Sequence, residues 1–180
     1  MNRFVLTLAL AMFAIAPASA APKTGDAAPD FSAQAALAGK EFRFTLSEAL
    51  RQGPVVVYFY PAAFTSGCSI EAHLFATNIE RYKALGAIVI GVSGDDIATL
   101  DKFSTADCQS KFPVASDEDR TIMTAYGAED GDYAARISFV IAPDGAHGKI
   151  IYSYRNDDPD LHVAKTISAI QDWKKKQPSP

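Results

Sequence analysis

The sequence predicts one α/β domain built on a mixed β-sheet with helices on both faces. The chain has 180 residues, of which 48% are hydrophobic, enough for one compact domain with a buried core. Segments with the pattern of strands alternate with segments with the pattern of helices, and two late strands are separated by a tight turn. No repeat, low-complexity tract or linker divides the chain after residue 20.

The first half of the chain contains the two clearest buried strands. Residues 42–44 alternate like a short strand, and residues 47–52 suit a turn of helix. Residues 55–60 and 87–92 are continuous runs of apolar residues, typical of strands buried on both faces. Between them the spacing predicts one helix that ends at Gly86 and buries a stripe of six residues: Ile70, Leu74, Phe75, Ile79, Tyr82 and Leu85.

The second half adds short elements and then a hairpin. Three segments follow in order: a helix from 97 to about 105, an extended piece at 112–115 and one or two helical turns at 122–126. Residues 137–141 and 149–154 predict an antiparallel hairpin around the turn at 143–145. A closing amphipathic helix buries Val163, Ile167 and Ile170. This order of elements is a thioredoxin-like outline, in which function sits at the carboxyl ends of strands.

Residues 1–20 have the composition of a cleaved export signal. Arg3 supplies a positive start, residues 4–16 are almost wholly apolar, and residues 18–20 are small. About 13 apolar residues are too few for a helix that spans a bilayer, which needs roughly 20. We therefore expect cleavage after Ala20 and a periplasmic or secreted protein, residues 21–180, with no membrane attachment after cleavage.

Charge and histidine spacing disfavour two further classes of function. The chain has 17 basic and 21 acidic residues, a net charge of -4, which lacks the basic footprint of a nucleic-acid partner. The histidines, His73, His147 and His162, are far apart and lack metal-ligand spacing. We expect them to be solvated or to have packing roles.

Cys68 is the candidate nucleophile. It stands where the chain leaves the 55–60 strand and enters a helix, and free backbone N–H groups at a helix start stabilise a thiolate. Thr65 can either turn its hydroxyl towards the same pocket or act as an ordinary N-cap. Pro61 fixes the exit from the strand and shields the site from water. Glu71 is an acid in the first helical turn, which the helix dipole favours whatever else it does.

These residues resemble a known family. The spacing Pro61-x-x-x-Thr65-x-x-Cys68 matches the peroxiredoxin active-site motif, and the surrounding residues 58–72 resemble the bacterioferritin-comigratory, or peroxiredoxin Q, subgroup. Similar segments occur in the same order over the rest of residues 21–180: 25–31, 112–113 with 116–117, 125–127 and 136–141. The resemblance implies a thioredoxin-like fold and reduction of hydrogen peroxide or organic hydroperoxides by a cysteine, without a metal, haem or flavin cofactor.

The resemblance also implies roles for two distant residues. Arg136 would be the second polar clamp of the site, although without the resemblance a surface ion pair with Asp130 or Asp132 would be expected. Cys108 would be a resolving cysteine that forms a disulfide with Cys68, which an exported thioredoxin-like partner then reduces. Two alternatives stay open for Cys108: a permanent structural bridge, or a spectator role while an external thiol resolves Cys68.

Two other functions remain possible on sequence grounds. The first is an exported thiol-disulfide oxidoreductase, although that chemistry usually relies on C-x-x-C, and Ile70 and Glu71 follow Cys68 instead. The second is a non-enzymatic binding domain in which Cys68 and Cys108 form a plain structural bridge. We therefore expect a monomeric thiol peroxidase that uses a peroxide substrate and a thioredoxin-like reductant.

Overall fold

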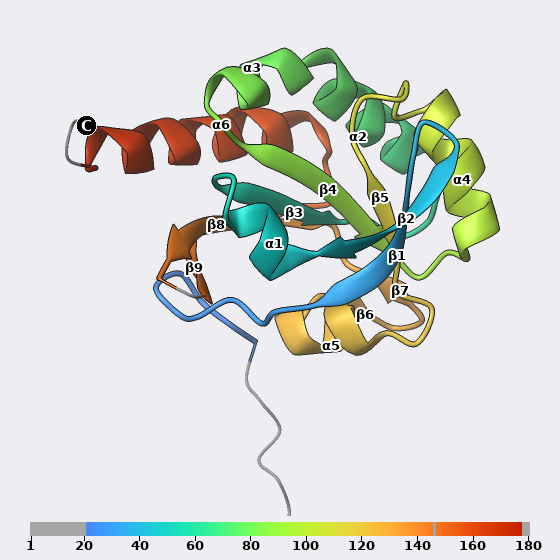
Figure 1. Ribbon diagram of the computed structural model, residues 1–180. Helices are drawn as coiled ribbons and strands as arrows, with labels where there is room; N and C mark the ends of the chain where they lie inside the picture. The colour runs from blue at the N-terminus through green and yellow to red at the C-terminus, as the bar shows by residue number, and fades with distance from the viewer. Residues whose placement is uncertain (1–20, 146, 178–180) are drawn as a thin grey trace, which may run out of the picture.

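A computed structural model describes residues 21–145 and 147–177 (Figure 1). The predicted export signal, residues 1–20, lies outside the described residues. The centre is a seven-stranded sheet in the order β2-β1-β5-β4-β3-β8-β9. Its strands are β1 (Ser32–Leu37), β2 (Lys40–Thr45), β3 (Val55–Phe59), β4 (Ile88–Ser93), β5 (Val114–Ser116), β8 (Ile137–Asp144) and β9 (His147–Arg155). A separate two-stranded sheet pairs β6 (Glu129–Asp130) with β7 (Tyr133–Ala134).

The sheet is mixed, and helices cover both of its faces, as the sequence predicts. Strand β3 runs parallel to β4 on one side and antiparallel to β8 on the other, and β8 and β9 form the predicted hairpin. One face packs against α1 (Leu46–Leu50) and α5 (Thr121–Tyr126). The opposite face packs against α2 (Ser66–Thr77), α3 (Ile79–Ala84), α4 (Ile97–Ala106) and α6 (Asp160–Lys175) (Figure 1).

The helix predicted between β3 and β4 is divided in two. Helix α2 ends and α3 begins at Asn78, whose side-chain amide donates to the Leu74 carbonyl at 2.9 Å. A side chain that bonds the backbone in this way competes with continuation of the helix. The predicted buried stripe is also displaced at its start, because Ile70 is 48% exposed while Glu71 is fully buried. Glu71, which faces the core in place of Ile70, forms a buried ion pair with Arg136.

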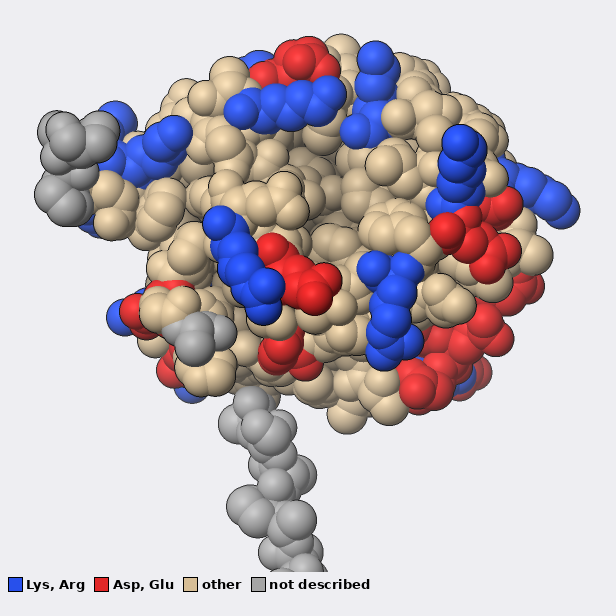
Figure 2. Space-filling view, viewed as in Figure 1, with Lys and Arg blue, Asp and Glu red and all other residues tan. Residues whose placement is uncertain are grey.

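The surface carries charges of both signs. Figure 2 shows basic and acidic side chains interspersed on one face, with acidic ones gathered near α5 and the β6–β7 sheet. Within residues 21–145 and 147–177, no helix is both long enough and apolar enough to cross a membrane.

Candidate active site

The loop between β3 and α2 holds Cys68 at the carboxyl end of the central strand. Asp95, just beyond β4, accepts hydrogen bonds from the Ala63 backbone N–H and the Ser93 hydroxyl, both at 2.7 Å. Phe64 adopts a left-handed backbone with φ 62°, and its ring packs edge-on against Phe103 at 5.2 Å. The chain then enters α2 with Cys68 in the first turn and only 2% exposed.

Pro61 and Thr65 frame this loop. Pro61 is half-buried two residues after the end of β3, and Thr65 is exposed at the N-cap position of α2. The Thr65 hydroxyl donates to the Ala62 carbonyl at 2.9 Å and makes no side-chain cap bond. Its carbonyl accepts the Ser69 N–H at 2.9 Å. Thr65 therefore closes the loop upon itself in this structure, and the first amides of α2 remain without a side-chain cap from it.

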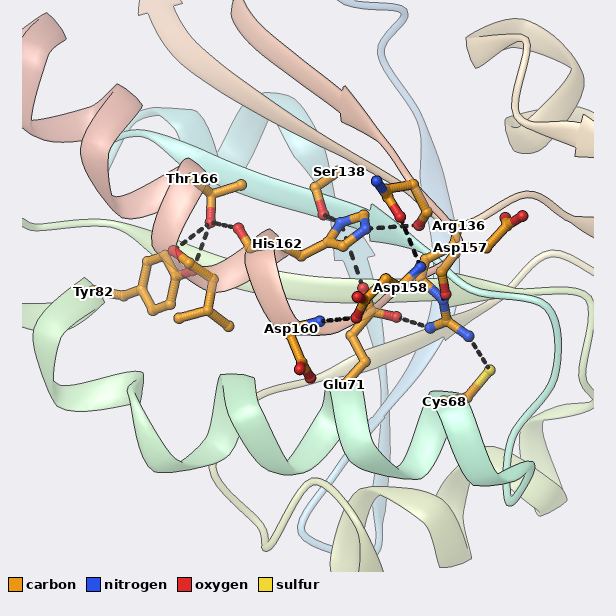
Figure 3. A network of polar contacts seen from close by, with 12 residues as sticks. Cys68, Glu71, Tyr82, Arg136, Ser138, Asp157, Asp158, Asp160, His162 and Thr166 are labelled. Carbon is orange, nitrogen blue, oxygen red and sulfur yellow. Dashed lines mark hydrogen bonds and ion pairs between the residues drawn. The ribbon is translucent and has the colours of Figure 1, made fainter.

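Arg136 joins the site from the segment that precedes β8. Its side chain is nearly buried and has three partners (Figure 3). Nη2 donates to Cys68 Sγ at 3.5 Å, Nη1 pairs with the Glu71 carboxylate, and Nε donates to the Asp157 carbonyl at 3.0 Å. A Cβ at Gly67 would lie 3.0 Å from Nη2, so glycine allows this close approach.

The surface ion pair considered for Arg136 does not form. Asp132 instead pairs with Arg120 at 3.0 Å, and both of those side chains are substantially exposed. The structure thus brings together Cys68 and Arg136, which are 68 residues apart in the chain. A guanidinium beside the sulfur stabilises the thiolate and any negative charge that develops on a molecule that the thiolate attacks.

Glu71 is a member of the site that the sequence analysis explained only by the helix dipole. It lies one helical turn after Cys68 on the same face of α2 and is fully buried. Burial raises the pKa of its carboxyl to about 7, despite the opposing effect of Arg136. Its Oε1 has no hydrogen-bond partner within the described residues. The spacing of three from Cys68 was the available signal for this residue.

His162 is a second residue that the sequence analysis missed, because a solvated or packing role was expected. It is fully buried on α6, with Nδ1 2.8 Å from the Ser138 hydroxyl and Nε2 3.0 Å from the Asn156 carbonyl (Figure 3). Nδ1 also lies 3.5 Å from Glu71 Oε1. Burial lowers the pKa of His162. The buried polar network therefore extends from Cys68 through Arg136 and Glu71 to α6.

Cys108 is a free, buried thiol just after α4. Neither it nor Cys68 is in a disulfide in the described part of the chain. Burial, reinforced by the charge of Asp107, raises the pKa of the Cys108 thiol well above its ordinary value. The next two residues, Gln109 and Ser110, have left-handed φ values of 52° and 58°. Such conformations are costly for residues other than glycine, so the segment after Cys108 is strained.

A contact on the surface links the two cysteine regions. Gln109 Nε2 lies 2.9 Å from Nε2 of His73, which is on α2 five residues after Cys68. Both cysteines also border the same buried cluster, in which Tyr58 and Tyr60 bury hydroxyls that have no protein hydrogen-bond partner among the described residues. The segment after α4 is thus packed against the helix that carries Cys68.

Comparisons with known proteins agree with this geometry. A chloroplastic peroxiredoxin Q of Oryza sativa subsp. japonica is 33% identical over 151 residues, covering 82% of this chain and 66% of the relative. The chain thus spans just under two thirds of that relative's length. A putative peroxiredoxin of Mycobacterium tuberculosis is 39% identical over 119 residues, covering 62% of this chain and 73% of the relative. These relatives confirm the resemblance to peroxiredoxins of the Q subgroup.

Solved structures confirm the thioredoxin-like fold. The peroxidoxin BcpB from Mycobacterium tuberculosis superposes with a TM-score of 0.75 and 28% identity, over 83% of this chain and 97% of that one. AhpC of the same organism has a TM-score of 0.75 at 20% identity, over 89% of this chain and 97% of its own, and supports the fold alone. The AhpC/TSA family model matches residues 24–152, well over half of the sequence. The chain belongs to the AhpC/TSA family.

Proposed function

We propose that this protein is a thiol peroxidase that reduces hydrogen peroxide and organic hydroperoxides with Cys68 as the nucleophile. The observation that carries the proposal is the hydrogen bond from Arg136 Nη2 to Cys68 Sγ, 3.5 Å long, at a nearly buried thiol in the first turn of α2. A fixed cation and the helix start both favour the reactive thiolate. The named relatives, all peroxiredoxins, support the same chemistry.

The reaction is a two-electron displacement. A lone pair of the Cys68 thiolate forms a bond to the terminal peroxide oxygen, and the O–O bond breaks. The departing oxygen takes the bond pair and the proton that the Cys68 thiol released on ionising, leaving as water or an alcohol, while Cys68 becomes a sulfenic acid that keeps the proton of the attacked oxygen. The Arg136 guanidinium offsets charge on both the thiolate and the departing oxygen, which is the role of a preorganised electrostatic donor.

We further propose that Cys108 resolves the sulfenic acid. Its sulfur would attack the Cys68 sulfur, forming a disulfide and releasing water, and an exported thioredoxin-like thiol would then reduce that disulfide. We expect movement in this step, because Cys108 is fully buried and its raised pKa keeps it a thiol until it becomes exposed. A disulfide also needs Cα atoms roughly 4.4 to 6.8 Å apart. Rearrangement of the segment that contains Gln109 and Ser110 would relieve the strain of their left-handed backbone conformations.

The alternatives for Cys108 are a structural bridge with Cys68 and a spectator role. The export of residues 21–180 to the periplasm or medium, and a monomeric state, belong to the same proposal and rest on the sequence pattern. For the experiment, the protein is therefore prepared without residues 1–20, and both cysteines are fully reduced.

A peroxide consumption assay with a chemical dithiol reductant tests the proposal. Wild type should consume peroxide catalytically, and Cys68→Ser should lose at least about nine tenths of that rate while unfolding at the same temperature, because a hydroxyl replaces the thiolate nucleophile. Cys108→Ser is the matched control, since the dithiol can resolve Cys68 directly. Reduction of insulin without peroxide consumption would show an oxidoreductase instead, and inertness in both assays would show a binding domain.

A further inference from the structure

We propose that His162 is a positioning residue for peroxide reduction: together with Glu71 it retains a proton that leaves Arg136 available to Cys68. The inference rests on the proposed thiol peroxidase function and adds a residue on α6 to that site. His162 acts through Glu71 and Arg136, since its ring contacts the carboxylate and not the sulfur.

The Arg136 guanidinium is shared by two groups that can each carry a negative charge. Arg136 contacts both the Glu71 carboxylate and the Cys68 sulfur, and these three side chains are buried or nearly so. With Glu71 ionised and Cys68 a thiolate, two negative charges face one positive charge in a place where water screens little. Glu71 therefore competes with the thiolate for Arg136. A proton near Glu71 removes that competition.

The hydrogen-bond partners of His162 show where a proton near Glu71 can reside. The Asn156 carbonyl can only accept, so Nε2 of His162 must carry hydrogen and donate to it at 3.0 Å. The other nitrogen, Nδ1, faces Glu71 Oε1 at 3.5 Å, and that oxygen has no hydrogen-bond partner within the described residues. An ionised Glu71 beside a neutral His162 would oppose two lone pairs. One proton on either atom converts this repulsion into attraction.

The neighbouring groups allow the proton to reside on either His162 Nδ1 or Glu71 Oε1. The Ser138 hydroxyl, 2.8 Å from Nδ1, can donate to a neutral ring or accept from a protonated one. Burial raises the pKa of Glu71 to about 7 and lowers that of His162, so neither group is fully charged by itself near neutrality. A proton shared between Glu71 and His162 is bound more tightly than a proton on Glu71 alone, so the pair keeps it to a higher pH than Glu71 would by itself.

The other groups that face His162 are few. Arg136, from the segment before β8, disfavours its protonation, and Asp158, in the loop before α6, favours it. The Tyr154 ring of β9 packs edge-on at 4.9 Å. Tyr82 of α3 is engaged one turn away, with its hydroxyl 2.7 Å from Thr166 (Figure 3). Glu71 is thus the carboxylate placed to exchange a proton with Nδ1.

The test compares wild type with His162→Asn, whose amide keeps a neutral polar group near the Nδ1 position but cannot titrate. Stopped-flow kinetics give the rate constant for sulfenic acid formation at each pH, using hydrogen peroxide as the probe. We expect the variant to be slower by about three- to tenfold between about pH 7 and pH 8, where Glu71 alone would be ionised while the wild-type pair still holds its proton. The ratio of the wild-type to the variant rate constant should approach one near pH 5, where Glu71 is protonated in both proteins, and again near pH 9, where both have lost the proton.

The double variant Glu71→Gln with His162→Asn supplies the control. Without the carboxylate there is nothing to neutralise, so adding His162→Asn to Glu71→Gln should change the rate less than about 1.5-fold at any pH. A ratio that is the same at every pH, or a full effect in the Glu71→Gln background, would overturn the inference. If wild type itself forms no sulfenic acid, the proposed function fails instead.

A measurement on the unaltered protein covers the case in which His162→Asn fails to fold. Nitrogen chemical shifts of histidine-labelled wild type report the protonation of the His162 ring, and variants that lack His73 or His147 assign the other two sets of resonances. The His162 Nδ1 resonance should shift as the pair loses its proton. An Nδ1 resonance that does not move between about pH 5 and pH 9 would contradict the inference.

Discussion

Arg136 shows how one residue determines the chemistry of this site. Its planar guanidinium serves a sulfur, a carboxylate and a carbonyl at the same time, with N–H groups in fixed directions. Lysine has the same charge but a single nitrogen on a flexible stem, so it cannot reproduce the fork. The geometry around Cys68 therefore depends on the shape of Arg136 as well as on its charge.

Arg136→Lys should slow sulfenic acid formation about ten- to a thousandfold, the range for loss of one charge-stabilising donor. Stopped-flow kinetics with hydrogen peroxide measure this rate. The matched control is Arg120→Lys, since Arg120 forms an exposed ion pair with Asp132 and should leave the rate unchanged. Equal rates for wild type and Arg136→Lys would mean that the guanidinium geometry is unimportant.

Glu71 makes stability depend on pH in a defined direction. Its pKa rises from an ordinary 4.5 to about 7 in the folded chain, so the folded state binds this proton more tightly than the unfolded state. The stabilisation is complete below about pH 4.5 and is lost as pH rises through about 7. Relative to Glu71→Gln, wild type should lose up to about 3 kcal/mol across this window.

Urea unfolding of both proteins at a series of pH values measures the difference. Because the comparison subtracts the titration of exposed groups common to both, the remaining slope reports Glu71 and its partner His162. A relative stability that stays level between pH 5 and pH 7, and falls instead as the pH drops below about 4.5, would show that the Arg136 ion pair outweighs burial.

At the scale of single elements, β4 must pass close to an aromatic ring of β3. Gly91 pairs with Tyr58 across the parallel strands, and a Cβ at Gly91 would lie 2.8 Å from the Tyr58 ring. Tyr58 has no room to yield, since it is buried and stacked on Phe75 with ring centroids 4.3 Å apart. The β3–β4 pair that carries the active-site loop therefore needs glycine here.

Gly91→Ala should lower the free energy of unfolding by about 1 to 3 kcal/mol, the usual cost of overpacking a core. Gly94→Ala is the control, because its nearest neighbour beyond the adjacent residues is the Met123 methyl group at 3.7 Å. Urea unfolding at one pH compares the two. Equal stability of both variants would show that Tyr58 can move aside.

Elements with strong local patterns were predictable, and those that depend on partners were not. Strands β3 and β4 are continuous apolar runs, which identify buried strands without further information. Strand β1 has the sequence SAQAAL, with no β-branched or aromatic residue, and its conformation comes from pairing with β2 and β5. Sequence alone gave no signal for this strand.

Some residues of the candidate active site were predictable from local sequence, and others depend on tertiary packing. Cys68, Thr65 and Pro61 lie in one contiguous motif, so local spacing identifies them. Glu71 and Arg136 are 65 residues apart, and only folding shows that the acid is buried against the guanidinium. His162 carries no sequence signal at all, because its role depends on α6 lying across the end of β8 beside α2. Burial of polar groups is decided by tertiary packing.

For the whole molecule, the proposed resolution of Cys68 by Cys108 would couple the reaction to a conformational change. Cys68 of α2 and Cys108 after α4 are both packed in one buried cluster, so we expect both segments to loosen when the two residues bond. Peroxide should therefore convert reduced protein to a monomer with a Cys68–Cys108 disulfide and speed amide hydrogen exchange in residues 66–69 and 107–111.

Hydrogen exchange with mass spectrometry, before and after one equivalent of peroxide, measures this change. Cys108→Ser is the control, because it reacts with peroxide without forming the disulfide and should keep the slow exchange of the reduced state. Exchange that is unchanged in oxidised wild type would mean that no rearrangement accompanies resolution. A disulfide already present before peroxide, resistant to mild thiols, would identify a structural bridge.

The Sγ atom of Cys68 is the proposed nucleophile towards peroxide, and trapping the sulfenic acid product tests this assignment. Reduced Cys108→Ser protein receives one equivalent of hydrogen peroxide and a reagent that labels sulfenic acid, followed by peptide mass spectrometry. We predict stoichiometric labelling at Cys68, formed within seconds. Peroxide that remains unconsumed, with Cys68 recovered as an unmodified thiol, would contradict the account.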